Sequence, residues 1–116
     1  MLYITVNGRT LTADLADNSS AQALKDMLSS GPRTIPMSDY ASMEKVGSLG
    51  QSLPRNDEQI TTEAGDIILY QGNQITIYYS RNTWNFTRLG KINGVSAQEL
   101  RTILGNGDVS VTFSLG

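Results

Sequence analysis

The sequence predicts a mainly β protein, a small antiparallel β-barrel whose open ends are capped by two short helices. Apolar and polar residues alternate in many short segments joined by tight-turn sequences, which is typical of strands with one buried face. Two other segments have helical spacing and begin with capping-box sequences. The chain has 116 residues, so we expect residues 1–116 to form a single domain.

A first hairpin is expected at the N-terminus. Asn7-Gly8 lies between two segments of alternating apolar residues, Leu2 to Val6 and Leu11 to Leu15. This dipeptide favours a type I′ turn, because both central residues of that turn need positive φ.

A short helix should follow over roughly Ser20 to Leu28. Ser19 to Gln22 fits a capping box, and Ala21, Leu24 and Leu28 lie at helical spacing. Gly31-Pro32 then ends the helical pattern.

The segment from Arg33 to Glu63 has weak periodicity and carries two of the three prolines. We expect a strand near Arg33 to Met37 and then a long, partly ordered excursion. Compact domains rarely contain about 20 irregular residues without a functional reason, so this excursion is the first place to look for function. The alternative is that it only covers an open end of the barrel.

The stretch from Gly65 to Ile92 predicts the central strands. Ile67 to Tyr70 and Gln74 to Ser80 read as a second hairpin, whose second strand has a polar face. A loop is expected over residues 81–85. Phe86 to Ile92 should be the next strand, and Gly90 indicates a bulge or a close backbone approach there.

The C-terminal part is predicted to be a helix followed by a strand. Ser96 to Glu99 is a second capping box, an apolar stripe follows it, and Gly105 stands where a C-cap belongs. Val109 to Leu115 alternates apolar and polar residues, which predicts a half-buried strand.

The composition excludes several kinds of chemistry. The chain has neither Cys nor His, so disulfides, Cys/His zinc sites and Ser-His-Asp triads are impossible. The nine Lys and Arg residues are scattered in a chain of net charge -2, so no nucleic-acid partner is expected. We also expect no metal and no cofactor.

No stretch approaches the roughly 18 apolar residues of a membrane span. Met1 leads directly into the segment LYITV, without the pattern of a signal peptide. The expected location is therefore cytoplasmic; the alternative is an exported or lipid-anchored protein whose N-terminal signal was trimmed.

Two groups of side chains are candidates for ligand contact. Trp84 lies between Arg81 and Arg88 and could stack on a planar ligand, or it could fill a gap in the core. Met37, Tyr40 and Met43, with Leu49, offer the soft surface of an adaptable apolar groove, or they pack as a satellite core under the excursion.

The acidic residues are expected to have no catalytic role. Glu44-Lys45 and Asp57-Glu58 are adjacent pairs whose side chains point to opposite sides of an extended chain, so solvated charge is the favoured interpretation. Asp66 at a strand entry is expected to bond its own backbone as a turn residue.

A set of motifs spread over nearly the whole chain resembles the bacterial cyclophilin-like domain family. The motifs are Met37-Ser38-Asp39-Tyr40, Glu44-Lys45-Val46-Gly47, Leu53-Pro54, Asn56-Asp57, Gly65-Asp66-Ile67, Leu69-Tyr70, Thr87-Arg88-Leu89-Gly90-Lys91-Ile92 and Val109-Ser110-Val111-Thr112-Phe113. The resemblance implies a closed eight-stranded barrel with short helices at its ends.

True cyclophilins isomerise X-Pro bonds, which requires a pocket that favours the twisted amide and a donor to the prolyl nitrogen. The nearest match to the enzyme's donor motif is Lys45-Val46 with Leu49 and Gln51, where the resemblance implies an Arg and an aromatic residue in place of Lys45 and Leu49. Ile75 and Thr76 stand where the enzyme has two Phe residues, whereas Trp84 and Gly90-Lys91-Ile92 keep the enzyme's order. Efficient isomerase activity is therefore not expected.

We expect a non-catalytic barrel that binds a small molecule or a peptide segment. Its groove should lie between the Met37 to Leu53 excursion and the polar face of Gln74 to Ser80, with these binding contacts: Met37, Tyr40, Met43, Lys45, Gln74, Tyr78 and Trp84. A register slip by one residue would exchange Tyr78 for Tyr79 in the groove. The alternatives are a weak peptidyl-prolyl cis-trans isomerase with Lys45 or Arg88 as donor, and a purely structural or partner-docking domain.

Overall fold

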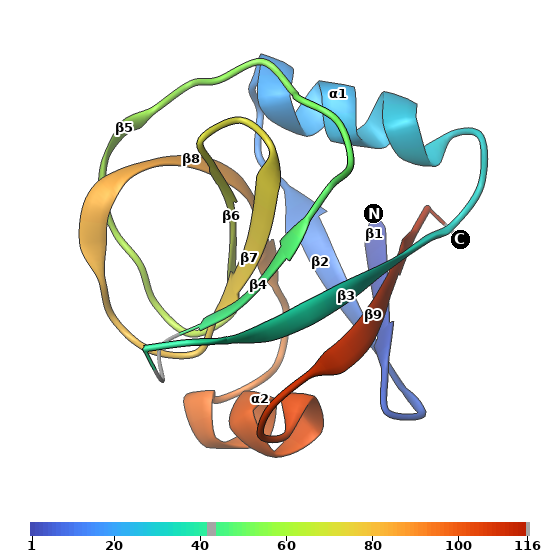
Figure 1. Ribbon diagram of the computed structural model, residues 1–116, viewed down its shortest axis with the longest axis vertical. Helices are drawn as coiled ribbons and strands as arrows, with labels where there is room; N and C mark the ends of the chain where they lie inside the picture. Colours follow the sequence, from blue (N-terminus) through green and yellow to red (C-terminus); the bar gives the residue numbers. More distant parts are fainter. Residues whose placement is uncertain (42–43, 116) are drawn as a thin grey trace.

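The computed structural model describes residues 1–41 and 44–115 (Figure 1). Across these residues the chain forms two helices, α1 (Ser19–Leu28) and α2 (Ala97–Leu104). The strands are β1 (Leu2–Val6), β2 (Arg9–Leu15), β3 (Arg33–Tyr40), β4 (Glu44–Ser48), β5 (Glu58–Thr61), β6 (Asp66–Tyr70), β7 (Gln74–Tyr78), β8 (Thr83–Ile92) and β9 (Val109–Ser114).

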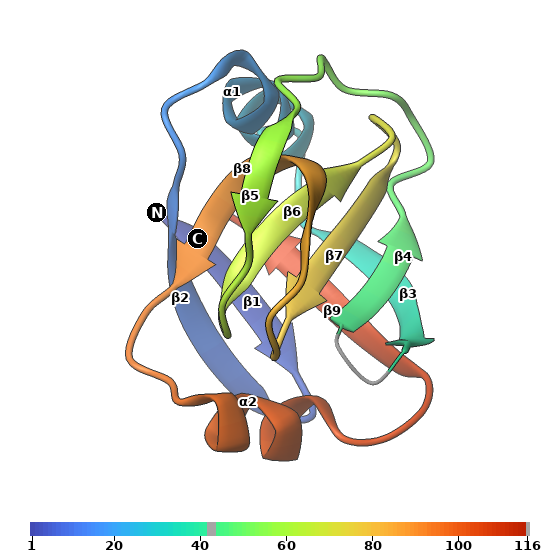
Figure 2. The same cartoon turned by 90° about the vertical axis from the view of Figure 1, so that its left-hand side faces the viewer.

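Eight of the strands close into an antiparallel barrel. They follow the order β2-β1-β9-β3-β4-β7-β6-β8, and β8 returns to β2 through the pairs Ala13 with Ile92 and Leu15 with Gly90. The helices α1 and α2 lie at opposite ends of the barrel (Figure 2). The expected fold, a mainly β, closed eight-stranded barrel with two short helices, is confirmed.

Several local predictions are also confirmed. Asn7 and Gly8 both have positive φ, 49° and 76°, as a type I′ turn requires. At α2, Ser96 and Glu99 form the reciprocal capping box, and Gly105 is the C-cap. Gly90 combines both expected features, because the β6–β8 register shifts beside it and a Cβ there would lie 2.5 Å from the Asp14 carbonyl oxygen.

The predicted capping box of α1 is wrong, since Asn18 is the N-cap and its side chain accepts a hydrogen bond from the Ala21 N–H at 2.8 Å. The two serines that follow Asn18 instead hold the loop at 49–57. Ser20 donates to the Pro54 carbonyl, and the Asn56 amide donates to the Ser19 hydroxyl at 2.8 Å.

The long irregular excursion is much shorter than expected. β3 continues to Tyr40, and β4 pairs with both β3 and β7, so the long irregular stretch among the described residues of this segment is 49–57, between β4 and β5. β4 escapes detection because its inward positions are Lys45 and Gly47 in place of large apolar residues. Gly47 is needed there, since a Cβ would lie 2.5 Å from the Pro36 carbonyl oxygen.

β8 is longer than predicted and divides into two halves. Residues 87–92 pair within the barrel, whereas Thr83–Phe86 pair with β5, which stands outside the closed ring. Figure 2 shows β5 and the first half of β8 lying across the outer side of β6. This flap forms a second layer beside the barrel wall.

Apolar side chains pack in two separate clusters. The main core fills the barrel and includes Ile67, Leu69, Ile75 and Ile77. Because neighbouring strand residues face opposite sides, Ile68 and Tyr78 point outward, where they pack with Ile60 and Phe86 of the flap. Neither described helix has the length and apolar character needed to cross a membrane.

Candidate functional site

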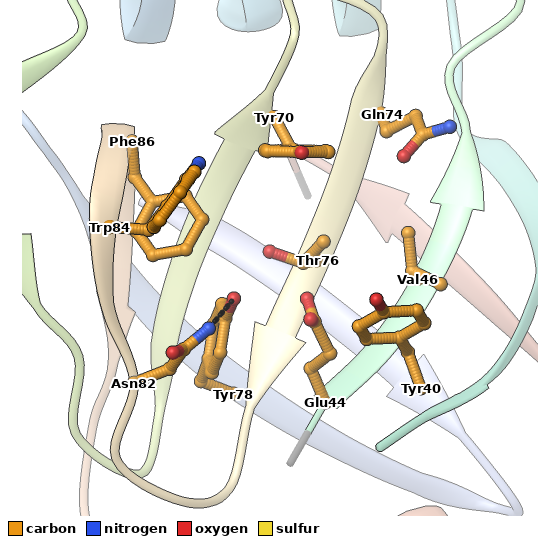
Figure 3. Close-up of a pocket in the computed structure, with 10 residues that line it drawn as sticks. All are labelled: Tyr40, Glu44, Val46, Tyr70, Gln74, Thr76, Tyr78, Asn82, Trp84 and Phe86. Carbon is orange, nitrogen blue, oxygen red and sulfur yellow. Dashed lines mark hydrogen bonds between the residues drawn. The ribbon is translucent and has the colours of Figure 1, made fainter. Parts of the chain in front are cut away.

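A pocket of about 340 Å³ opens on the outer face of the barrel (Figure 3). The polar face of β7 forms its floor, β4 and the end of β3 form one wall, and the flap forms the other wall. Among the described residues it is lined by Tyr40, Glu44, Val46, Tyr70, Gln74, Thr76, Tyr78, Asn82, Trp84 and Phe86. Two parts of the chain, residues 40–46 and 70–86, therefore meet here.

Five of these ten side chains are aromatic, and they differ in exposure. Phe86 is buried and packs edge-on against Tyr70 and tilted against Tyr78, with ring centroids 6.0 Å and 5.6 Å away. Tyr40 and Trp84 stand on opposite walls and are 60% and 61% exposed. Trp84 therefore does not fill a gap in the core, and its ring is open to a ligand.

Glu44 is the acidic residue of the pocket, and its side chain is only 6% exposed. Burial raises the pKa of its carboxyl to about 7, although hydrogen bonds from the Tyr78 and Thr76 hydroxyls act in the opposite direction. The expectation of a solvated Glu44-Lys45 pair is wrong, because both side chains are buried on opposite sides of the barrel strand β4. A carboxyl that titrates near neutral pH in a cleft is typical of functional sites.

Tyr78 links Glu44 to the far wall. Its hydroxyl accepts a hydrogen bond from the Asn82 side-chain amide at 3.3 Å, drawn in Figure 3, and donates toward Glu44. Burial raises the pKa of Tyr78 above its ordinary value, so this phenol stays protonated at neutral pH. Tyr78 is thus a polar contact in the floor, whereas Tyr79 points into the barrel core.

The comparisons with known proteins agree with this fold. The model of a family described as the cyclophilin-like family matches residues 4–114. The chain belongs to the cyclophilin-like family. The resemblance to such a family is therefore confirmed.

A solved structure of McbB in complex with tryptophan is similar to this cyclophilin-like chain, with a TM-score of 0.69 and 16% sequence identity. The match covers 98% of this chain but 44% of that chain, so this chain spans less than half the length of McbB. At that identity the likeness shows the fold alone. No curated protein matches the chain.

The cyclophilin-like barrel brings four of the predicted binding residues to the pocket, namely Tyr40, Gln74, Tyr78 and Trp84. Their role in binding stays a prediction. Met37 does not line the pocket, because it points into the barrel and is fully packed in the main core. Met43 lies outside the described residues.

Lys45 is also absent from the pocket, because it points to the opposite side of β4 from Glu44. It is fully buried, with its Nζ 2.7 Å from Asp39 Oδ1 and 2.5 Å from the Gly107 carbonyl oxygen that accepts its hydrogen bond. The hydrogen bond from Lys45 and a second one from the Gly107 N–H lower the pKa of Asp39 to about 2. Lys45 thus ties the β3–β4 hairpin to the loop after α2.

Arg88, the other candidate isomerase donor, is likewise outside the pocket. It lies 3.4 Å from Asp66, beside Lys91, in a separate polar pocket of about 330 Å³. Asp66 is the expected turn residue, since its carboxylate accepts a hydrogen bond from the Glu63 N–H at 2.8 Å. Neither predicted donor is placed to reach a ligand in the pocket.

The remaining lining residues were not predicted individually: Glu44, Val46, Tyr70, Thr76, Asn82 and Phe86. Thr76 could have been found, because it shares the polar face of β7 with Gln74 and Tyr78. Glu44 and Phe86 could not, since their position depends on the pairing of β4 with β7 and on the fold of the flap.

Proposed function

We propose that this cyclophilin-like barrel binds a small organic molecule in the pocket between β4 and the flap. The observation that carries the proposal is the lining itself: aromatic walls surround one buried carboxyl and a few hydroxyl and amide groups. Ligand sites in proteins are mostly apolar and aromatic, with a small number of polar groups that orient the ligand.

The size of the pocket favours a small molecule over a long peptide. Its volume of about 340 Å³ is near the lower end of the range of roughly 300–1,000 Å³ for ligand sites. The exposed Tyr40 and Trp84 flank the space, so a flat molecule can contact both walls. The tryptophan complex of McbB supports the idea that a protein containing this fold can hold a molecule of this size.

The isomerase alternative has no supporting observation. Isomerisation needs a donor aimed at the prolyl nitrogen, and Lys45 and Arg88 both lie outside the pocket. Binding without catalysis therefore remains the proposed function.

The proposal can be tested by NMR with a library of small aromatic amines, amino acids, alcohols and acids. Compounds that bind should shift the backbone amides of Gln74, Thr76 and Tyr78, and Trp84→Ala should weaken binding about tenfold because it removes one wall. Tyr3→Ala, on a strand distant from the pocket, is the matched control and should leave affinity unchanged. Shifts confined to the α2 end, or no shifts with any compound, would refute the proposed function.

A further inference from the structure

We infer that the ligand of this pocket is an organic cation, a protonated or quaternary nitrogen attached to a flat apolar body, and that the Glu44 carboxylate is its counter-ion. This inference rests on the proposed function and names the ligand class of the same site. It follows from the charges of the pocket, from its aromatic faces and from the surroundings of Glu44.

The described lining of the pocket has one acidic side chain and no basic one. Of the ten described lining residues, Glu44 is the one whose side chain becomes charged near neutral pH, and none is Lys or Arg. The neighbouring Lys45 cannot neutralise it from behind, because Lys45 points to the other side of β4 and is paired with Asp39 at 2.7 Å. A buried carboxylate is stable only with an opposite charge or several hydrogen bonds, so the missing charge is supplied best by the ligand.

The walls favour the same kind of ligand. The faces of Trp and Tyr rings attract cations, and cages of aromatic side chains recognise ammonium groups in other proteins. Here Tyr40 stands beside Glu44, while Trp84 faces it from the flap (Figure 3). A nitrogen placed near Glu44 would therefore lie between the walls that carry Tyr40 and Trp84, and an apolar body would rest on Phe86 and Tyr70.

The groups around Glu44 leave it as the titrating residue of the site. Tyr40 faces it from β3, Tyr78 and Thr76 from β7, and Tyr70 lies beyond them on β6. Asn82 in the loop before β8, and Trp84 and Phe86 of the flap, do not titrate, and the Asp39–Lys45 pair lies behind β4. Because burial raises the pKa of Glu44 to about 7, a bound cation must lower that pKa and release a proton. An anion would have the opposite effect and take up a proton.

Three probes of one skeleton separate these cases: 2-phenylethylamine, 2-phenylethanol and phenylacetate. At pH 8 the amine should bind about tenfold more tightly than the alcohol, and phenylacetate should bind most weakly. Between pH 8 and pH 6 the affinity for the amine should fall about tenfold, because protonation of Glu44 with a pKa of about 7 removes the counter-ion. Carbon-detected NMR of the Glu44 carboxyl should show its pKa lowered in the amine complex.

Glu44→Gln should abolish the preference for the amine and its pH dependence, while Glu63→Gln, an exposed carboxylate outside the pocket, should change neither. Equal or tighter binding of the alcohol or of phenylacetate in the pocket would overturn the cation inference and leave the proposed function standing. Failure of the amine to bind at millimolar concentration would also overturn the inference. Failure of these probes together with the whole library would overturn both proposals.

Discussion

The two faces of β4 bury opposite charges in different ways. On the inner side, Lys45 is fully buried but has a carboxylate at 2.7 Å and a backbone carbonyl at 2.5 Å. On the outer side, Glu44 is nearly as buried, has hydroxyl partners but no cation among the described residues of the pocket, and its pKa rises to about 7. A charge that is satisfied within the fold serves stability, whereas a charge left without a counter-ion in a cleft marks a place where something binds.

The largest effect should come from breaking the satisfied pair. Lys45→Met keeps the apolar volume and removes the cation, and among the described residues Asp39 keeps the Gly107 N–H and the Tyr79 hydroxyl as partners. We expect a loss of about 3 kcal/mol in the free energy of unfolding at pH 7, measured with urea.

The pairing itself is tested by a double-mutant cycle. Asp39→Asn should cost clearly less in the Lys45→Met background than in the wild type, because its partner is already gone. Additive losses would show that Lys45 does not stabilise the fold through its pairing with Asp39.

On the outer face of β4, burial of Glu44 should lower the free energy of unfolding as the pH rises, by an amount on the order of 2 kcal/mol. The pKa of Glu44 is raised from 4.5 to about 7, so the folded protein holds the proton that the unfolded chain has lost between these values. Stability should therefore fall as the pH rises from 4.5 to 7 and then level off. Glu44→Gln should remove this decline, and a variant with an unchanged pH profile would contradict the account.

Asp39 should change the stability with pH in the direction opposite to Glu44, because its pKa is lowered and not raised. Its pKa is lowered from 3.8 to about 2, so the stability that it contributes is present above pH 3.8 and is lost as the pH falls toward 2. Asp39→Asn should flatten this acid limb of the wild-type profile while Glu44→Gln leaves it in place. Unfolding by urea at a series of pH values measures both limbs.

The flap provides a test of binding with little effect on stability. Trp84 is the single Trp of the chain, so its fluorescence reports directly on pocket occupancy. Because its side chain is 61% exposed, Trp84→Ala should change the free energy of unfolding by less than about 1 kcal/mol. Wild-type fluorescence that stays constant while NMR shows a bound ligand would place the ligand away from this wall.

Elements that depend on contacts between residues close in sequence were predicted better than elements that depend on contacts between distant residues. The Asn7-Gly8 turn and the α2 capping box are local, and both were predicted correctly. β4 was missed because its inward residues are a paired Lys45 and a Gly47 that lets β3 approach, and neither produces an apolar pattern. The periodicity of apolar residues indicates which positions are buried among apolar neighbours. It does not detect a position that is buried by charge pairing or by close backbone contact.

The candidate site was predicted in part for the same reason. The polar face of β7 follows from alternation alone, and this face is the floor of the pocket. The two walls depend on long-range pairing, of β4 with β7 and of β5 with the first half of β8. Glu44, 30 residues or more from Gln74, Thr76 and Tyr78 in sequence, could be placed beside them only once the sheet order was known.

The smallest predicted effect is a change in the pKa of Glu44 when its hydrogen bond from Tyr78 is removed. The Tyr78 hydroxyl hydrogen-bonds to the Glu44 carboxyl and lowers its pKa against the larger effect of burial. Tyr78→Phe removes this donor while keeping the ring that packs on Phe86, so the pKa of Glu44 should rise further, by less than about one unit. Carboxyl NMR titration measures the shift, and Tyr40→Phe is the matched control that should leave the pKa unchanged, because the hydrogen bonds that lower the pKa of Glu44 come from Tyr78 and Thr76. A pKa that falls in Tyr78→Phe would mean that hydration of the vacated space, more than loss of the hydroxyl, controls this carboxyl.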